Sequence, residues 1–240
     1  MRLSLGASGV AIASLVLLGL AGPAYRLGLP LSTAFTMVRW ASYGALGGAA
    51  LAVGAVFWAR RKGGKNRGAA TSVASLGVIL GVLTAAGGYG WLRQAQRAPL
   101  LHDVTTDLEN PPLFQALVSL RASAANSLAR TREVDQLQRQ HYADLAPVTV
   151  AQPPRLVFDR SHLIAENQGW QIVTADPGAG RIEATDTTAW FGLTDDIVVR
   201  LTPWGTGTRV DVRSVSREGT SDLGTNARRI RRFLAALQEP

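Results

Sequence analysis

Residues 170–216, WQIVTADPGAGRIEATDTTAWFGLTDDIVVRLTPWGTGTRVDVRSVS, contain the pattern that decides the fold of this chain. Apolar and polar residues alternate over 170–175 and 181–185, and DPGAG between them is a turn. The segments 196–202 and 208–216 repeat this arrangement around PWGTG. A period of two is typical of strands with one buried face. We therefore predict two hairpins that together form a four-stranded antiparallel meander.

In the last of these strands, valines and charged residues alternate from Val210 to Arg213. Val210, Val212 and Val215 are predicted to point to a core, and Asp211 and Arg213 to face solvent. Val215 does not fit the alternation. It indicates a bulge or a frayed strand end.

Helical patterns lie on both sides of the meander. Residues 132–142 follow Thr131, a suitable N-cap, and 153–169 begin with two prolines and end at a glycine. Residues 225–238 place apolar residues on one helical face. Within 153–169 an apolar stripe is predicted to be buried, and APVTV before it suggests a further short strand. The fold class is α+β, an antiparallel sheet flanked by helices. The stripe consists of Leu156, Val157, Leu163 and Ile164.

Charge is divided unevenly along the chain. Its 25 Lys and Arg against 17 Asp and Glu give a formal net charge of +8. Residues 1–94 contain nine basic and no acidic residues, whereas residues 95–240 contain 16 basic and 17 acidic residues. Nucleic-acid binding requires a cationic surface, so the nearly neutral second part is not predicted to bind nucleic acid. We place a domain boundary here, with a membrane anchor in 1–94 and a soluble domain in 95–240.

Three apolar segments before this boundary have the length of membrane-spanning helices. They cover about 3–25, 40–58 and 69–91 and contain no internal charge. The loop ARRKGGKNRG between the second and third is strongly basic, which places it in the cytoplasm. The chain after Trp91 would then lie outside, which for a bacterial inner membrane is the periplasm.

Two features of the anchor leave alternatives open. The first apolar segment also resembles a signal peptide, so that the chain has either three spans or two spans and a cleaved leader. Gly44 and Gly48, like Gly77 and Gly81, have the GxxxG spacing of closely packed helices. This spacing fits packing within the chain as well as dimerisation.

Several stretches of the second part resemble a known family. HDVTTDLENPPLF, GWQIVTADPGAGRIEATDTTAWFGLTDDIVVRL and RVDVRSVSREGTSDLGTNARRIRRFL are similar to the bacterial and plastid family catalogued as domain of unknown function 1499. The resemblance covers about 100–237. It implies a domain that often follows hydrophobic spans, and it implies no activity, catalytic residue or cofactor.

Acidic residues and a histidine are crowded into 100–114, the first polar stretch after the anchor. His102, Asp103 and Asp107 are candidates for acid–base or metal chemistry, together with Glu109. Their spacing does not suit a local metal site, and Asp and Thr side chains commonly form turns and caps. We therefore interpret 100–114 as an ordered strap that leads into the domain, and predict no metal.

Asp195 and Asp196 form a second acidic pair. Neighbours on a strand point to opposite faces, so they are not expected to act on one substrate. Asp196 remains a weak catalytic candidate, although a turn with one aspartate bonded to Arg200 or Arg209 is the preferred interpretation.

Two further groups are candidates for binding a partner. Aromatic residues near strand ends would line a groove between sheet and helix, and the arginines of 225–238 would contact anionic lipid or an acidic protein, or only solvent. The aromatic residues are Trp190, Phe191 and Trp204, and the arginines are Arg228, Arg229, Arg231 and Arg232.

Together these patterns predict an uncharacterised inner-membrane protein whose periplasmic domain binds or scaffolds an envelope component, either lipid or protein. One alternative is a membrane-anchored hydrolase that uses the Asp and His residues above. The other is an accessory subunit of a membrane complex, held through its spans. No cofactor is predicted, and the bilayer is the expected partner of the anchor.

Overall fold

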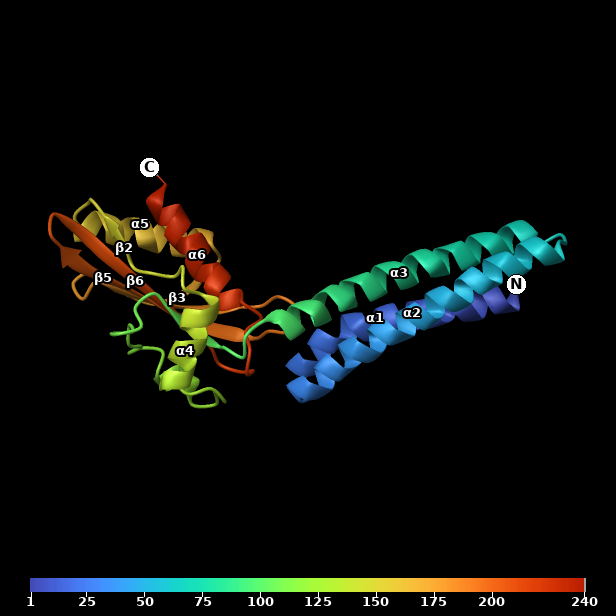
Figure 1. Cartoon of the computed structure of the whole chain (residues 1–240), viewed down its shortest axis with the longest axis horizontal. Coiled ribbons are helices and arrows are strands. Elements are labelled where there is room, and N and C mark those ends of the chain that lie inside the picture. Colours follow the sequence, from blue (N-terminus) through green and yellow to red (C-terminus); the bar gives the residue numbers. More distant parts are fainter. Residues whose placement is uncertain (240) are drawn as a thin grey trace. The chain divides into compact units, whose positions relative to one another are not determined.

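The computed structural model describes residues 1–239, and their contacts divide them into two units. The first unit is Met1–Arg97 together with Trp190–Gly192, and the second is the rest of 98–239. Figure 1 shows the helical first unit in blue to green and the mixed second unit in green to red.

The first unit consists of three long helices that pack against one another. They are α1 (Arg2–Arg26), α2 (Leu31–Lys62) and α3 (Arg67–Arg97). Each is long enough and apolar enough to cross a membrane, which confirms the three predicted segments as helices. The helices extend beyond the predicted segments because their polar ends continue the helical hydrogen bonding.

The helical unit has small residues inside and large apolar residues outside. Its buried positions are mostly alanine, serine and glycine, for example Ala11, Ala45 and Ala52. Leucine, isoleucine, valine and phenylalanine side chains such as Leu46 and Phe57 are exposed. Soluble proteins bury such side chains, whereas helices in lipid pack through small residues. The arrangement indicates membrane association.

The glycine pairs pack within the chain. Gly44 and Gly48 lie against α1, and Gly81 lies against α2, where an added Cβ would be 2.8 Å from the carbonyl oxygen of Ala45. The Ser8 hydroxyl of α1 also donates to the carbonyl of Val73 in α3 at 2.7 Å. The GxxxG spacing is thus used for intramolecular helix packing.

The second unit contains an antiparallel sheet of order β1-β6-β5-β4-β3, in which β2 also pairs with β6. The predicted meander is confirmed, but the sheet has six strands rather than four. β2 lies within APVTV and confirms the short strand expected there, whereas β1 has three residues, too few for alternation to identify it. The strands are β1 (Asp103–Thr105), β2 (Val148–Val150), β3 (Gln171–Asp176), β4 (Arg181–Thr187), β5 (Thr194–Trp204) and β6 (Gly207–Ser216).

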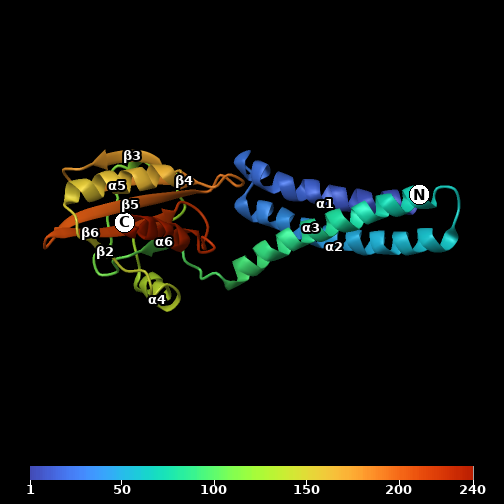
Figure 2. The same cartoon turned by 90° about the horizontal axis from the view of Figure 1, so that it is seen from above.

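One face of the sheet is covered by α5 (Pro154–Asn167) and α6 (Thr225–Gln238), which lie side by side over the strands in Figure 2. Between them is the apolar core, where the Trp170 ring stacks on Phe233 with centroids 5.1 Å apart. The predicted stripe of α5 is half wrong: Val157 and Ile164 are buried, but Leu156 and Leu163 are exposed. These leucines lie on the side of the helix turned away from the sheet.

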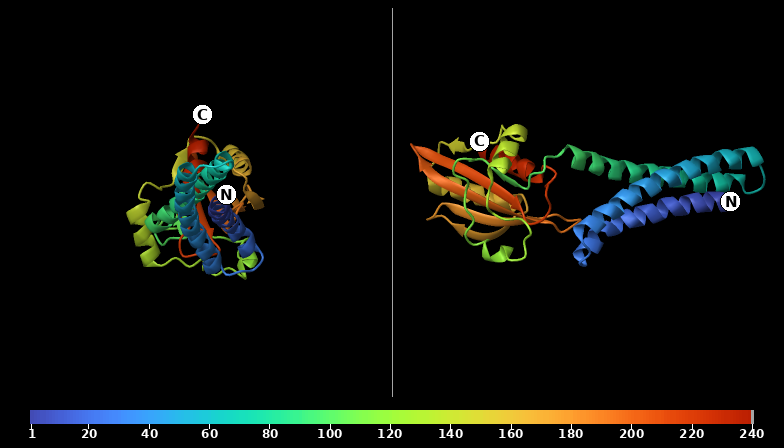
Figure 3. Two further views of the ribbon diagram at one scale, coloured as in Figure 1. Left: turned by 90° about the vertical axis from the view of Figure 1, so that its right-hand side faces the viewer. Right: turned by 60° about the horizontal axis from the view of Figure 1, so that its bottom comes forward.

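The opposite face of the sheet is polar and is covered by residues 106–131, which we call the cover segment (Figure 3, right). This segment includes the 3-10 turn Ser119–Arg121 and leads into α4 (Arg132–His141), whose first turn is capped by the Thr131 side chain, as predicted. Phe114 and Leu117 of the segment pack against Val198 and Val215 of the sheet.

Three expectations for β6 are wrong because the cover segment lies over this strand. Asp211 and Arg213 do not face solvent, since they are 1% and 2% exposed beneath the segment. Val215 marks neither a bulge nor a frayed end, because the pairing of β5 with β6 is continuous from Asp195↔Ser216 to Trp204↔Gly207. Val215 instead fills a small apolar cluster on the polar face.

Candidate functional site

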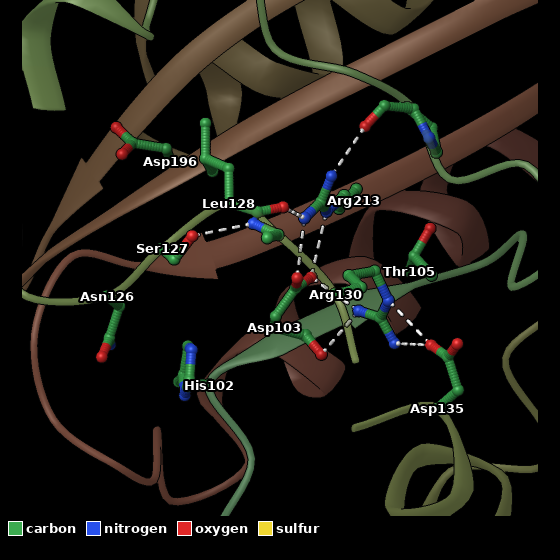
Figure 4. Close-up of polar contacts among 12 residues, drawn as sticks. His102, Asp103, Thr105, Asn126, Ser127, Leu128, Arg130, Asp135, Asp196 and Arg213 are labelled. Carbon is green, nitrogen blue, oxygen red and sulfur yellow. Dashed lines mark hydrogen bonds and ion pairs between the residues drawn. The ribbon is translucent and has the colours of Figure 1, made fainter. Parts of the chain in front are cut away.

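Asp103, the most buried acid of the strap, is held by two arginines (Figure 4). Arg213 binds it through both carboxylate oxygens, with Nε–Oδ1 at 3.1 Å and Nη2–Oδ2 at 2.7 Å. Arg130 adds an ion pair at 2.7 Å to Oδ1 and a second pair with Asp135 at 2.9 Å. A carboxylate enclosed in this way has little capacity left to accept a proton from a substrate.

Arg213 also holds the cover segment against the sheet. Arg213 donates to the carbonyl of Leu128 at 2.6 Å and to that of Pro112 at 3.4 Å. The side-chain amide of Gln138 in α4 bonds to both the N–H and the C=O of Thr105, as a neighbouring strand would. The outer edge of β1 is therefore satisfied by a side chain.

Asp107 has a similar structural role. Its Oδ1 accepts the backbone N–H groups of Glu109 and Asn110, which fixes the turn before the two prolines. Its Oδ2 lies 3.2 Å from Arg200 and 2.8 Å from Arg209, and both arginines also bind Asp211.

Asp195 and Asp196 point to opposite faces of the sheet. Asp196 is fully buried beneath the cover segment between Arg121 and Arg217, the latter at 2.8 Å. Asp195 lies on the helix side, 2.7 Å from Arg229 of α6. The expected turn with a bond to Arg200 or Arg209 is wrong, because both aspartates lie within β5 and bind other arginines.

Glu183 was not predicted to be a site residue from the sequence, yet its carboxylate binds the cover segment to the sheet. It is fully buried and accepts the backbone N–H groups of Gln115 at 2.7 Å and Leu117 at 2.9 Å. Within residues 1–239 the partly or fully buried ion pairs of the domain join eight arginines with eight carboxylates. The formal charges of these side chains therefore sum to zero. The arginines are 121, 130, 181, 200, 209, 213, 217 and 229, and the acids are 103, 107, 135, 183, 186, 195, 196 and 211.

His102 lies beside this network without forming a metal site. Burial lowers the pKa of its imidazole, which favours the neutral form, while the neighbouring Asp103 acts in the opposite direction. Its backbone carbonyl accepts from Ser216 and Asn226. In the described chain no three His, Cys, Asp or Glu side chains converge as metal ligands, and Glu109 forms an exposed ion pair with Arg139.

The arginines of α6 are not equivalent. Arg229 is 3% exposed and bound to Asp186 and Asp195. Arg231 pairs with Asp144 at 2.6 Å near the surface. Arg228 and Arg232 are exposed and bond to uncharged groups of their surroundings. Only Arg228, Arg231 and Arg232 are therefore placed where a partner could reach them.

Asp222 precedes α6 and caps its first turn. Its carboxylate accepts the N–H groups of Gly224 at 2.8 Å and Asn226 at 2.6 Å. Burial nevertheless raises its pKa to about 6, with a further contribution from the charge of Asp195. Arg229 is thus surrounded by three carboxylates, those of Asp186, Asp195 and Asp222.

The three aromatic candidates do not share one groove. Trp190 and Phe191 lie in the β4–β5 connection, a few residues before β5 begins at Thr194. Trp204 is the last residue of β5 and is 57% exposed, with the Arg209 guanidinium 5.8 Å from its ring centroid. The strand separates the two groups by about 30 Å at its usual rise per residue.

A family model described as "Protein of unknown function (DUF1499)" matches residues 103–237. The chain belongs to the DUF1499 family. The match begins at Asp103 and ends near the last turn of α6, so it covers the sheet, the cover segment and the helices of the second unit. No similar protein is found among curated proteins.

The residues that carry the family resemblance make defined contacts in the structure. In the HDVTTD run, Asp103 binds Arg213, and Thr106 exchanges hydrogen bonds with Val212 of β6 at 2.9 Å. Asp107 joins Arg200 and Arg209. In the WFGLTDD run, the two aspartates bind arginines on opposite sides of the sheet. The acidic residues of this DUF1499 domain hold its layers together.

Proposed function

We propose that this DUF1499 chain is a membrane-anchored protein whose soluble domain lies on the extracytoplasmic side and binds or scaffolds an envelope component. The basic residues between α2 and α3 support the orientation, because cytoplasmic loops carry an excess of Lys and Arg. Three consecutive spans with a cytoplasmic second loop direct the chain after Arg97 to the other side. In a bacterial inner membrane that side is the periplasm.

Reporter fusions test the orientation. Alkaline phosphatase fused after Arg97 is expected to be active, because it folds only after export, and the same enzyme fused after Lys65 is expected to be inactive. A cytoplasmic reporter such as green fluorescent protein should give the reverse pattern. If phosphatase were active after Lys65 and inactive after Arg97, the domain would be cytoplasmic.

The observation that supports a binding role is the surface of the cover segment. Residues 110–129 contain a single charged residue, Arg121, and its side chain is buried against Asp196. Leu113, Val118 and Leu120 on the same segment are 66%, 52% and 52% exposed. An uncharged surface with several exposed apolar side chains is characteristic of interaction sites.

The outer side of the cover segment is separate from the ion-pair network on its inner side. Phe114 and Leu117 face the sheet and hold the segment in place, whereas Leu113, Val118 and Leu120 contribute nothing to either apolar cluster. These three side chains are free to contact a protein or lipid partner without opening the domain.

Site-specific photo-crosslinking tests the binding role. A photoreactive amino acid at Val118, in the full chain in native membranes, is expected to give discrete adducts with one protein or lipid species. Leu163 is the matched control, since it is 56% exposed on α5 at the other face of the sheet. Identical adducts at both positions, or none at Val118, would remove the support for this surface.

A further inference from the structure

The β4–β5 connection has a fixed base and an uncharged tip. Thr188 and Leu193 are joined by two hydrogen bonds, N–H to carbonyl at 2.9 Å and N–H to hydroxyl at 3.0 Å. The hydroxyls of Thr187 and Thr194 lie 3.0 Å apart. Residues 187–194 contain no charged residue, and only 189–192 project beyond the base.

The tip presents two aromatic rings. Trp190 and Phe191 lie against each other with ring centroids 4.6 Å apart; Trp190 is 38% exposed, whereas Phe191 beside it is 6% exposed. Neither residue belongs to the apolar clusters of the sheet domain, and by its contacts Trp190–Gly192 is grouped with the helical unit. The two rings therefore do not serve the stability of the sheet from which they project.

The chemistry of the tip suits the boundary between lipid and water. Indole rings combine an apolar body with a polar N–H, and tryptophan is enriched at both membrane interfaces. A charged residue in the tip would oppose insertion, and residues 187–194 contain none.

The chain also keeps the tip close to a bilayer. Residues 98–102 join the spanning helix α3 to β1, and a fully extended linker of this size reaches at most about 18 Å. Such a short tether gives the second attachment a high effective concentration of lipid. Modest intrinsic affinity is then sufficient for stable contact.

We propose that the β4–β5 tip is a second membrane attachment, in which Trp190, with Phe191 packed beside it, inserts into the interfacial layer of the bilayer that holds the helices. The attachment fixes the orientation of the domain relative to the lipid surface. This inference rests on the apolar helices and the aromatic tip. It is independent of the binding role proposed for the cover segment, which uses other residues.

The absence of cysteine from the chain makes the test direct. Ala189→Cys in the tip places a single label close to Trp190. Thr206→Cys in the β5–β6 turn places a single label close to Trp204. The full-length chain carrying an environment-sensitive fluorophore is placed in nanodiscs of phosphatidylcholine and phosphatidylglycerol. We expect the label at 189 to be quenched by lipids with a shallow nitroxide and to be several-fold less sensitive to iodide than the label at 206.

Serine replacements complete the design. Trp190→Ser with Phe191→Ser, in the Ala189→Cys background, should expose the label to iodide and remove its quenching by lipid. The same replacements with Thr206→Cys should leave that label unchanged, which shows that the domain remains folded. Equal iodide quenching at 189 and 206, or protection at 189 without lipid quenching, would overturn the proposal, the second result because it indicates cover by protein.

Discussion

Replacement of Asp103 by alanine is expected to destabilise the DUF1499 domain by about 3–5 kcal/mol, because it leaves buried charge without a partner. Arg213 and Arg130 both lose their shared carboxylate, and both side chains are almost fully buried. A domain of this size is stable by only about 5–15 kcal/mol. The variant should therefore be largely unfolded at moderate urea concentrations where the parent is folded.

Pulse proteolysis of the full chain in nanodiscs measures this loss. Asp159→Ala is the matched control, because Asp159 also pairs with an arginine, Arg155 at 3.1 Å, but on the exposed side of α5. Exposed pairs of this kind contribute about 0.3–0.5 kcal/mol. If Asp103→Ala resisted proteolysis as well as Asp159→Ala, the strap aspartate would not be structural, and a role in chemistry would become the better explanation.

Arg229→Met is the second large effect that we expect. The change removes the guanidinium that binds Asp195 and Asp186. The charges of Asp195 and Arg229 also act on the carboxyl of Asp222. At pH 7 the loss should again be about 3–5 kcal/mol, since breaking a buried pair leaves an uncompensated charge. Methionine retains the apolar stem of the side chain, so little of the effect should come from lost packing.

The effect of Arg229→Met should depend on pH. In the parent, burial raises the pKa of Asp222 to about 6, and the charge of Arg229 opposes this shift. Without Arg229 the pKa of Asp222 should rise further above its unfolded value, so that the folded state binds more protons than the unfolded state. The stability of the variant should therefore increase as the pH falls from 7 towards 5.

The arginines next to Arg229 provide its controls. Arg228→Met and Arg232→Met alter exposed side chains that bond to a carbonyl, a hydroxyl and an amide oxygen, and surface changes of this kind are usually within about 0.5 kcal/mol. Equal effects of Arg228→Met and Arg229→Met, or a loss that did not shrink at lower pH, would contradict the buried cluster around Arg229.

The regular parts of the fold could be predicted from the sequence because they follow a period. The alternation of 170–216 identified the meander, and the uninterrupted apolar segments identified the three long helices. The strand β1 is too short to show a period, and β2 was expected only as an isolated short strand in APVTV. Their pairing with β6 depends on contacts between segments distant in the chain, which a local pattern does not contain.

The polar face of the sheet was missed for a different reason. Asp211 and Arg213 alternate with valines as solvent-facing residues do, and nothing within β6 shows that another segment covers them. The available signal was in the cover segment itself. Residues 110–129 have almost no charge and several apolar residues, so they required a surface to pack on, and Val198 and Val215 of the sheet provide its apolar part.

The candidate acids were recognised as unusual, but their arginine partners could not be assigned. Asp103 and Arg213 are 110 residues apart in the chain, and only the β1–β6 pairing brings them together. The opposite directions of Asp195 and Asp196 follow from strand geometry alone and were predicted correctly. Which arginine each would meet depends on α6 and the cover segment, whose positions the strand pattern does not determine.

Native-state hydrogen exchange of the cover segment tests most directly whether the acids of this domain are structural. The amides of Gln115 and Leu117 are bound to the buried carboxylate of Glu183, so they exchange only when the segment leaves the sheet. We predict that, in the full chain in nanodiscs, both are protected as strongly as the amides shared by β5 and β6. Exchange as fast as that of exposed loops would mean that the segment opens readily, and the charged face beneath it would then be an accessible site.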